Sequence, residues 1–334
     1  MKRVLIIINK AFEADAALSA IFDPDICHPD LDFGKKDGAV FNLVRDKLRF
    51  PWDFDQGAEK PRVVFKTKNF QYEVWCIQNI MTPPPNNADP MYYSYSYQKV
   101  ADFPKILEYS TVPVVMVVAF GTAGCPTEVS KNGGLVIGSN AFIYDVPAPS
   151  PSNPPTPPIP RYESDQFGML LPSTVNPTLF AQLNLGLAPL YMHLYFELKA
   201  LLPSINPAPN FPVVADPSII AVSDMNIVSY AQFATADSAA LKAYSNAYKP
   251  PVNPPVPPAN YNTAYSVETT HGLIRLQAKC DNFMFISAIT DRDAYFANEV
   301  TPRASAQNFA CAFNGGVFLS WFLPFLDKNA VLIG

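Results

Sequence analysis

The sequence predicts an α/β fold with a largely parallel or mixed sheet. Short β-branched runs alternate with longer helical patterns along the chain, which is the signature of this class. Two of the runs, Val4–Ile8 and Pro113–Ala119, are almost continuously apolar, as is typical of strands buried on both faces. The chain has 334 residues, of which 49% are hydrophobic, so it can build a large core.

In the first half of the chain, the run Val4–Ile8 is the first expected strand. Ala11–Phe22 follows with good helix formers, and Pro24 ends this helix. The later elements of this half show alternating or continuous apolar patterns for strands and helical spacing for helices. They are strands at Val63–Lys66, Tyr72–Ile77, Pro113–Ala119 and Leu135–Tyr144, and a helix at Lys99–Tyr109.

The second half of the chain continues the alternation and ends in a long apolar helix. Two proline-rich stretches, at about residues 146–162 and 249–260, should be extended polyproline II segments. Because the pattern of elements continues on both sides, we interpret them as insertions in one domain spanning residues 1–334. The expected elements are helices at Leu179–Leu202, Ser238–Tyr248, His271–Cys280 and Ala304–Phe322, and strands at Ile219–Val222, Ile227–Tyr230 and Phe283–Ile289.

Composition excludes several classes of protein and partner. The net charge of −5 argues against a nucleic-acid partner, which normally meets a basic surface. Five scattered cysteines predict no disulfide framework and favour a cytoplasmic location. The N-terminal apolar run is too short for a signal peptide, and Val317–Phe325 is too short to span a bilayer, so no membrane contact is expected. Low charge and many aromatic residues favour a homo-oligomer.

Acidic residues and a glycine-rich segment follow three of the expected strands. Glu13 comes after the first strand, Asp291 follows Phe283–Ile289, and Gly121–Gly124 follows Pro113–Ala119 as a predicted turn. Ligands collect at the carboxyl ends of strands in open α/β sheets, and glycines let the backbone approach them closely. Two carboxylates in different environments are what cleavage of a glycosidic bond requires.

Other polar clusters are less specific. The acidic segment Phe22–Phe33 fits no calcium loop and favours a solvated turn, and His193 lies among apolar residues typical of a core. The sequence has no GxSxG motif, and no GxGxxG follows the first strand. We therefore expect neither a metal nor a cofactor.

Four segments, in order, resemble the purine nucleoside phosphorylase/nucleosidase superfamily, and in particular its methylthioadenosine nucleosidase-like members. Val222-Ser223-Asp224 is a fainter match to the "VSGD" of the family. The four segments are Ile6–Leu18, which resembles the first strand and acidic helix; Val117–Gly124 with Gly134–Asp145, which resembles "TGSAGG…GDIVVSD…YHD"; Ser266–Thr270, which resembles "VEME"; and Phe285–Asp291, which resembles "VVRAISD".

This resemblance implies a three-layer αβα fold with a central mixed, partly barrel-like sheet, and cleavage of the N-glycosidic bond of a purine or related nucleoside. In such a reaction Asp291 would protonate the leaving base, for which it must hold a proton near neutral pH, and burial at a strand end favours this. Glu13 would orient the attacking water. The positions implied for substrate binding are Gly121, Thr122, Ala123, Asp224, Glu268, Thr269 and Thr270.

The chain also departs from the family pattern. Thr270 stands where a second glutamate binds the 2′- and 3′-hydroxyls of ribose, so an altered sugar is an open alternative. Ala119-Phe120 stands where phosphorylases carry an arginine, and Asn9-Lys10-Ala11 replaces their glycine-aspartate turn. Water is therefore favoured over phosphate as the nucleophile, although Lys10 could partly replace the arginine. The alternatives are a phosphate-dependent phosphorylase and a non-catalytic member that binds or stores a nucleoside.

Overall fold

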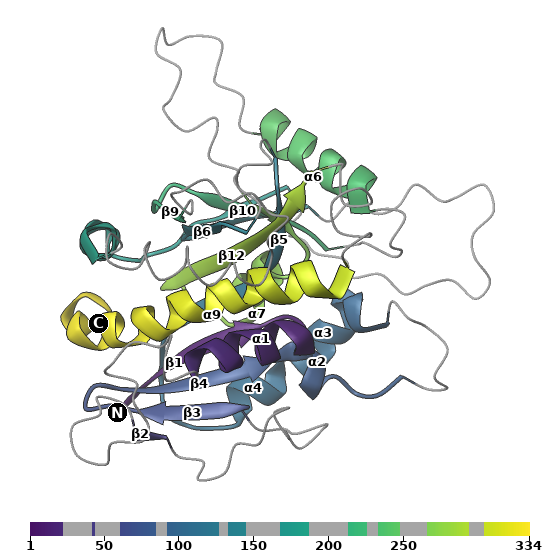
Figure 1. Ribbon diagram of the computed structural model, residues 1–334. Coiled ribbons are helices and arrows are strands. Elements are labelled where there is room, and N and C mark those ends of the chain that lie inside the picture. Colours follow the sequence, from purple (N-terminus) through teal and green to yellow (C-terminus); the bar gives the residue numbers. More distant parts are fainter. Residues whose placement is uncertain are drawn as a thin grey trace, which may run out of the picture.

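The computed structural model describes residues 1–22, 42–43, 61–84, 92–126, 133–144, 168–186, 213–225, 233–247, 266–293 and 304–334 (Figure 1). The described strands form one 12-stranded mixed sheet, and helices cover both of its faces. The predicted α/β class and its three-layer arrangement are therefore confirmed. The described strands branch, and their pairings do not close the sheet into a barrel.

One wing of the sheet is built around the first strand of the chain. β1 (Lys2–Ile8) pairs in parallel with both β4 (Phe70–Cys76) and β5 (Val114–Cys125). β3 (Val63–Lys66) pairs antiparallel with β4, and β2 (Asn42–Leu43) continues this wing beyond β3. The side chains of β1 from Arg3 onward are all buried, as predicted for a strand covered on both faces.

The sheet branches at β5. Strand β12 (Phe283–Arg292) pairs with β5 in parallel from Val117 to Cys125, whereas β11 (Ser266–Glu268) meets β5 only at Gly124. Each branch then carries further strands. They are β6 (Leu135–Gly138) and β9 (Val213–Ala215) beside β12, and β10 (Ile220–Asp224), β7 (Asn140–Tyr144) and β8 (Leu170–Leu171) beyond β11.

Alternation along the strands divides the core into two main layers. Val4, Ile6 and Ile8 face α1 (Ala11–Ile21) and α9 (Ala304–Lys328), which cross one face of the sheet together (Figure 1). Leu5 and Ile7 point to the opposite face, as a period of two requires. The remaining helices are α2 (Ile77–Ile80), η2 (Tyr92–Ser94), α3 (Ser96–Asp102), α4 (Pro104–Glu108), a helix over residues 177–186, α6 (Phe233–Ala247), α7 (His271–Gln277) and η5 (Ala330–Leu332).

Two predicted elements are each divided in the structure. The expected strand Leu135–Tyr144 breaks at Ser139, where β6 and β7 take different neighbouring strands. Gly138 permits the crossing, because a Cβ there would lie 2.5 Å from the Ile219 carbonyl oxygen. The expected helix Lys99–Tyr109 breaks between α3 and α4 because Pro104, which lacks an N–H, begins the second helix.

The predicted turn at Gly121–Gly124 is wrong. These residues belong to β5, which runs on to Cys125 because β12 pairs with it throughout this stretch. β12 itself extends beyond the predicted Ile289 and includes Asp291, with an irregularity in pairing between these two residues. The acidic residue therefore lies within the strand rather than after it.

Within the described residues, α9 is long and apolar enough to cross a membrane by length and composition alone. Its Gln307–Lys328 segment has a mean hydropathy of 1.6, and 83% of the apolar window is buried inside the molecule. A helix that packs on all sides in this way is a core helix. Gly316 lets it approach α1 closely, since a Cβ there would lie 2.4 Å from the Ala17 carbonyl oxygen.

Several predicted features lie outside the described residues. They are both proline-rich stretches, the acidic segment after Phe22, His193 with the second half of Leu179–Leu202, and the strand Ile227–Tyr230.

Candidate active site

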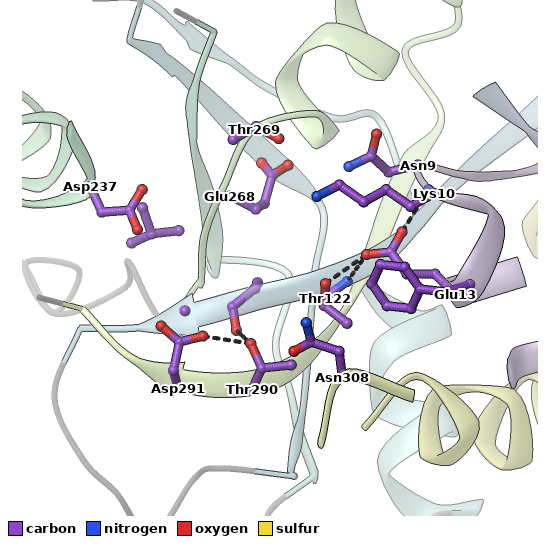
Figure 2. A pocket seen from close by; sticks show the side chains of 14 residues that line it. Asn9, Lys10, Glu13, Thr122, Asp237, Glu268, Thr269, Thr290, Asp291 and Asn308 are labelled. Carbon is purple, nitrogen blue, oxygen red and sulfur yellow. Dashed lines mark hydrogen bonds between the residues drawn. The ribbon is translucent and has the colours of Figure 1, made fainter. Parts of the chain in front are cut away.

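The candidate site forms where β5 continues beyond the end of β1. β1 ends at Ile8, opposite Phe120, whereas β5 runs on to Cys125 and meets β11 only at Gly124. Between these two partners, residues 121–123 of β5 are unpaired on this side, and they border a cavity of about 170 Å³ (Figure 2). The parallel strands β1, β5 and β12 all direct their carboxyl ends to this edge, as the sequence predicted for the site.

The cavity brings together most of the predicted site residues. Glu13, Thr122, Ala123, Glu268, Thr269 and Asp291 line it, while Gly121, Asp224 and Thr270 do not. Glu13 lies on helix α1 and Asp291 on strand β12, and Thr122 lies between them in the view of Figure 2. The other lining residues are Asn9, Lys10, Phe12, Gly124, Asp237, Val267, Thr290 and Asn308.

Glu13 is fixed by three hydrogen bonds although its side chain is fully buried. Its Oε1 accepts from the Thr122 backbone N–H at 2.8 Å and from the Thr122 hydroxyl at 2.6 Å. Its Oε2 accepts from the Lys10 backbone N–H at 2.8 Å, which caps the first turn of α1. Thr122 reaches Glu13 because it lies on the same face of β5 as Phe120, toward α1.

Asp291 lies on β12, is 3% exposed and faces the cavity. The Thr290 Oγ1 lies 2.5 Å from Asp291 Oδ1 and 3.3 Å from the Ala123 carbonyl oxygen. A hydroxyl has one hydrogen, and the shorter contact makes Asp291 its main acceptor, with the Ala123 carbonyl oxygen as a weaker second one. Thr290 therefore fixes the position of the Asp291 carboxyl group at the cavity.

Glu268 ends β11 and is held by the elements behind it. Its carboxylate accepts from the Ser223 hydroxyl on β10 and from the backbone N–H groups of Thr270 and His271, at the start of α7. The partial positive charge at a helix start favours an anion there. Glu268 is therefore held in place on one side while it lines the cavity on the other.

The remaining predicted residues support the site from behind. Gly121 adjoins Glu13, because a Cβ there would lie 3.5 Å from both carboxylate oxygens. Thr270 is 1% exposed and accepts a hydrogen bond from Lys99 Nζ at 3.2 Å. Asp224 is buried at the end of β10. The structure therefore puts these three next to the cavity rather than on its surface.

Two ionisable residues near the cavity were not predicted from the sequence. Asp237 on α6 is 7% exposed, lines the cavity, and has no hydrogen-bond partner among the described residues. Lys99 on α3 is fully buried behind the cavity and donates to Asn9 Oδ1 at 2.8 Å. Neither belongs to a local motif, so no signal in the sequence could single them out.

The two residues have shifted pKa values for different reasons. Burial lowers the pKa of Lys99 to about 7; the Lys10 charge acts in the same direction, whereas Glu13, Glu268 and Cys76 partly oppose it. For Asp237 burial is again the first cause, and neighbouring acidic groups add to it. The pKa of Asp237 is raised well above its usual value by burial and by Asp293, Asp291, Asp224 and Glu268.

His271 begins α7 directly behind the cavity. Burial lowers its pKa, and the charges of Glu268 and Glu13 act against this. Its ring stacks on Phe285 at 5.5 Å. His271 is therefore a neutral packing residue near neutral pH. Within the described part of the chain, no group of three or more His, Cys, Asp or Glu side chains is arranged to hold a metal ion.

Comparison with known proteins gives likenesses of fold only. No family model and no curated protein matches the chain. Similar solved structures include a futalosine hydrolase mutant of Helicobacter pylori, with 11% identity, a TM-score of 0.46, and coverage of 98% of this chain and 100% of that one. The 5′-methylthioadenosine nucleosidase of Arabidopsis thaliana has 13% identity, a TM-score of 0.44, and coverage of 97% and 96%. The S-adenosylhomocysteine nucleosidase of Streptococcus pyogenes has 13% identity, a TM-score of 0.43, and coverage of 96% of each chain. These proteins come from the superfamily that the sequence motifs resemble.

Proposed function

We propose that this protein hydrolyses the N-glycosidic bond of a purine or related nucleoside. The observation that carries the proposal is that Glu13 and Asp291, which are far apart in the sequence, line one cavity at the carboxyl edge of the sheet. Thr122, which binds Glu13, also lines this cavity and lies between the two acids in the view of Figure 2. Two carboxyl groups in different surroundings can take the separate roles of acid and base.

The surroundings of each acid favour one role. Glu13 accepts three hydrogen bonds, which hold its carboxylate in place and leave capacity for one water molecule. In the proposed reaction this water attacks the sugar carbon C1′ and gives its proton to Glu13. The bond from C1′ to the base breaks, and the base leaves with the proton donated by Asp291. The proton taken up by Glu13 returns through solvent, so both acids are restored.

Phosphorolysis is the second candidate, and one observation favours it. Lys10 lines the cavity and carries a positive charge, which a phosphate group needs. No other lining residue of the described cavity is cationic. One lysine beside Glu13 and Glu268 is a weak phosphate site, so water is preferred as the nucleophile. A non-catalytic nucleoside-binding role is the third candidate, and it is supported by Thr270 in place of an acid.

The proposal is tested by measuring free base by chromatography for a panel of nucleosides, with and without phosphate. Asp291→Asn should reduce base release by at least about a hundredfold, because general acid catalysis contributes about 10²–10⁴-fold. The exposed Asp216→Asn, at the end of β9, is the matched control and should retain full activity. Full turnover by Asp291→Asn would show that the acid is wrongly assigned, and strict dependence on phosphate would favour the phosphorylase.

We also propose a cytoplasmic, homo-oligomeric protein that folds as one nucleosidase-like domain. The free thiols of Cys76, Cys125, Cys280 and Cys311 support a reducing compartment. Light scattering at micromolar concentration tests the oligomer, and a monomer would contradict it.

A further inference from the structure

Two carboxyl groups, those of Asp237 on α6 and Asp291 on β12, line one end of the cavity, which we call the acidic end. In the view of Figure 2 both lie on the left side of the cavity. The chain segments that carry them are joined next to this end, because the Ser238 hydroxyl on α6 donates to Asp293 Oδ2, directly after β12, at 3.1 Å. The two acids therefore reach the cavity from elements that contact each other.

The Asp237 carboxyl group has no partner within the part of the chain that the structure describes. Asp237 is 7% exposed, and no described residue donates a hydrogen bond to it or forms an ion pair with it. A buried carboxylate without a partner is strongly unfavourable. The group must therefore either keep a proton or take its partner from a ligand, and it lines a cavity that can hold one.

The residues around Asp291 at this end add acceptors and apolar surface. Thr290 uses its hydroxyl hydrogen on Asp291 Oδ1 at 2.5 Å. Gly124 and Val267 also line the cavity, and a Cβ on Gly124 would lie 3.7 Å from Asp291 Oδ2 and 3.8 Å from the Val267 carbonyl oxygen. None of these three neighbours supplies a free side-chain donor. A ligand group that only accepts hydrogen bonds would find no partner among them.

The lining of the described cavity carries more acid than base. One ammonium group, that of Lys10, stands against four carboxyl groups, those of Glu13, Asp237, Glu268 and Asp291. In the view of Figure 2 the amino group of Lys10 points toward Glu268 and lies away from Asp237. A cleft lined mainly by one sign of charge attracts the opposite sign. The acidic end therefore favours a ligand that brings a positive charge.

We propose that the acidic end binds a positively charged nitrogen of an organic ligand, with Asp237 as its direct partner. In a nucleoside substrate this nitrogen is an ammonium group carried by the base. That assignment to the base rests on the proposed function, whereas the binding of a cation does not. The other source of the same chemistry is a separate small amine that binds beside the nucleoside.

An organic cation suits this end better than a metal ion does. Within the described residues no group of three or more His, Cys, Asp or Glu side chains is arranged to hold a metal, and hard cations take about six oxygen ligands or more. An ammonium group has three hydrogens and can be held by one carboxylate and a few further acceptors. The apolar side chain of Val267 offers contact to the carbon atoms beside the nitrogen.

The cation leaves Asp291 in its proposed role as the acid. When Asp291 gives its proton to the leaving base, it becomes a second carboxylate at the acidic end. A positive charge held by Asp237 offsets this new negative charge, so it favours the transfer of the proton.

Binding of the cation should release a proton. Burial first, and then Asp293 after β12, Asp291 on β12, Asp224 on β10 and Glu268 on β11, raise the pKa of Asp237 well above its usual value. A bound ammonium group favours the ionised carboxylate, so the proton leaves as the cation binds. Affinity for the cation should therefore rise with pH until the amine of the ligand loses its own proton.

Calorimetry on the full chain at about pH 7 tests the proposal. The probes are carbocyclic adenosines, in which carbon replaces the ring oxygen of the sugar, so that the bond to the base is not cleaved during the titration. Each carries an aminoethyl group, which is cationic, or a propyl group of the same size, which is neutral, attached through nitrogen at C2, C6 or C8 of the base. Propylammonium without a nucleoside probes the separate amine.

Three variants accompany the wild type. Asp237→Asn removes the charge at nearly constant volume, and Asp237→Glu keeps the carboxyl group. Asp216→Asn, at an exposed position after β9, is the matched control for loss of an acid. Titration in two buffers of different ionisation enthalpy, PIPES and HEPES, measures the number of protons released.

In the wild type and in Asp216→Asn, we expect at least one aminoethyl probe to bind at least about tenfold more tightly than its propyl counterpart, because hydrogen bonds between charged groups are strong. Its binding should release up to about one proton. Asp237→Asn should lose both the preference and the proton release, and Asp237→Glu should retain a preference. If propylammonium binds together with unsubstituted carbocyclic adenosine, the cation is a separate amine. If only the aminoethyl probes bind, it is a substituent of the base.

Two results would overturn the proposal. One is equal binding of cationic and neutral probes by the wild type at every position of attachment together with no binding of propylammonium, which includes no binding of any probe at millimolar concentration. The other is a preference for the cation that survives in Asp237→Asn. Failure of the proposed function looks different. In that case no nucleoside in the panel releases its base, while the preference for the cation and its loss in Asp237→Asn are still observed.

Discussion

Replacing Lys99 by methionine should change how the stability of the protein depends on pH. The Lys99 side chain is fully buried, and burial is the main cause that lowers its pKa from 10.5 to about 7. In the unfolded chain this lysine regains an ordinary pKa. Between pH 7 and pH 10.5, therefore, the unfolded state holds a proton that the folded state has lost.

The sign and size of the effect follow from proton linkage. Because the unfolded state binds more protons in this window, the free energy of unfolding rises with pH, by at most about 1.4 kcal/mol per pH unit for one group. Below about pH 7 both states are charged and the folded state carries the full cost of the buried ammonium group. From about pH 7.5 to about pH 9.5, the contribution of Lys99 should raise the free energy of unfolding of the wild type by about 2–3 kcal/mol.

Urea unfolding of the wild type and of Lys99→Met across this pH range measures the difference. Ionisation of Cys76, whose pKa burial raises to about 11, affects both proteins alike and cancels. The stability of the wild type relative to the variant should rise with pH, and the exposed Lys66→Met should show no such change. If the free energy of unfolding of the wild type and of Lys99→Met changed with pH in parallel, Lys99 would not be a buried lysine that loses its proton in the folded state.

Two further predictions concern Asp237 and the packing of α1 against α9. Asp237→Asn should stabilise the protein at pH 7 and above, as measured by the denaturation midpoint. The pKa of Asp237 is raised in the folded state, so the wild type loses stability as the pH rises from the pKa of the unfolded state through that of the folded state. Unchanged or lower stability of the variant would contradict this. Gly316→Ala should lower the free energy of unfolding by about 1–3 kcal/mol, because its Cβ would lie 2.4 Å from the Ala17 carbonyl oxygen, whereas Gly186→Ala, where a Cβ has nothing within 4 Å, should have little effect. Equal effects of the two alanine substitutions would contradict the close packing.

The sequence predicts elements well where one local pattern decides the structure. β1, the apolar part of β5 and β12 are continuous apolar runs, and they form strands where expected. The ends of β5 and β12 could not be predicted in this way. Residues 121–125 and 290–292 are small or polar, and they are strands because the two segments pair with each other. That pairing is a long-range contact with no local signature.

The same distinction holds for the candidate site. Glu13 and Asp291 could be placed near each other because Glu13 follows β1 and Asp291 lies at the carboxyl end of β12, and these ends meet at one edge. Asp237 and Lys99 could not, because each lies on a helix that contributes to the site through packing alone. How α6 and α3 approach the cavity depends on the branching of the sheet, which no single segment determines.

The unequal lengths of β1 and β5 have a consequence for ligand binding. The opening lies where one strand of a continuous sheet is missing, so its walls are held by the hydrogen-bonded strands around it, at a spacing of about 4.8 Å between neighbours. Such walls are preorganised, and binding spends little free energy on rearranging them. Selectivity at this opening should therefore reflect the fixed shape of its walls more than any adjustment of the protein around a ligand.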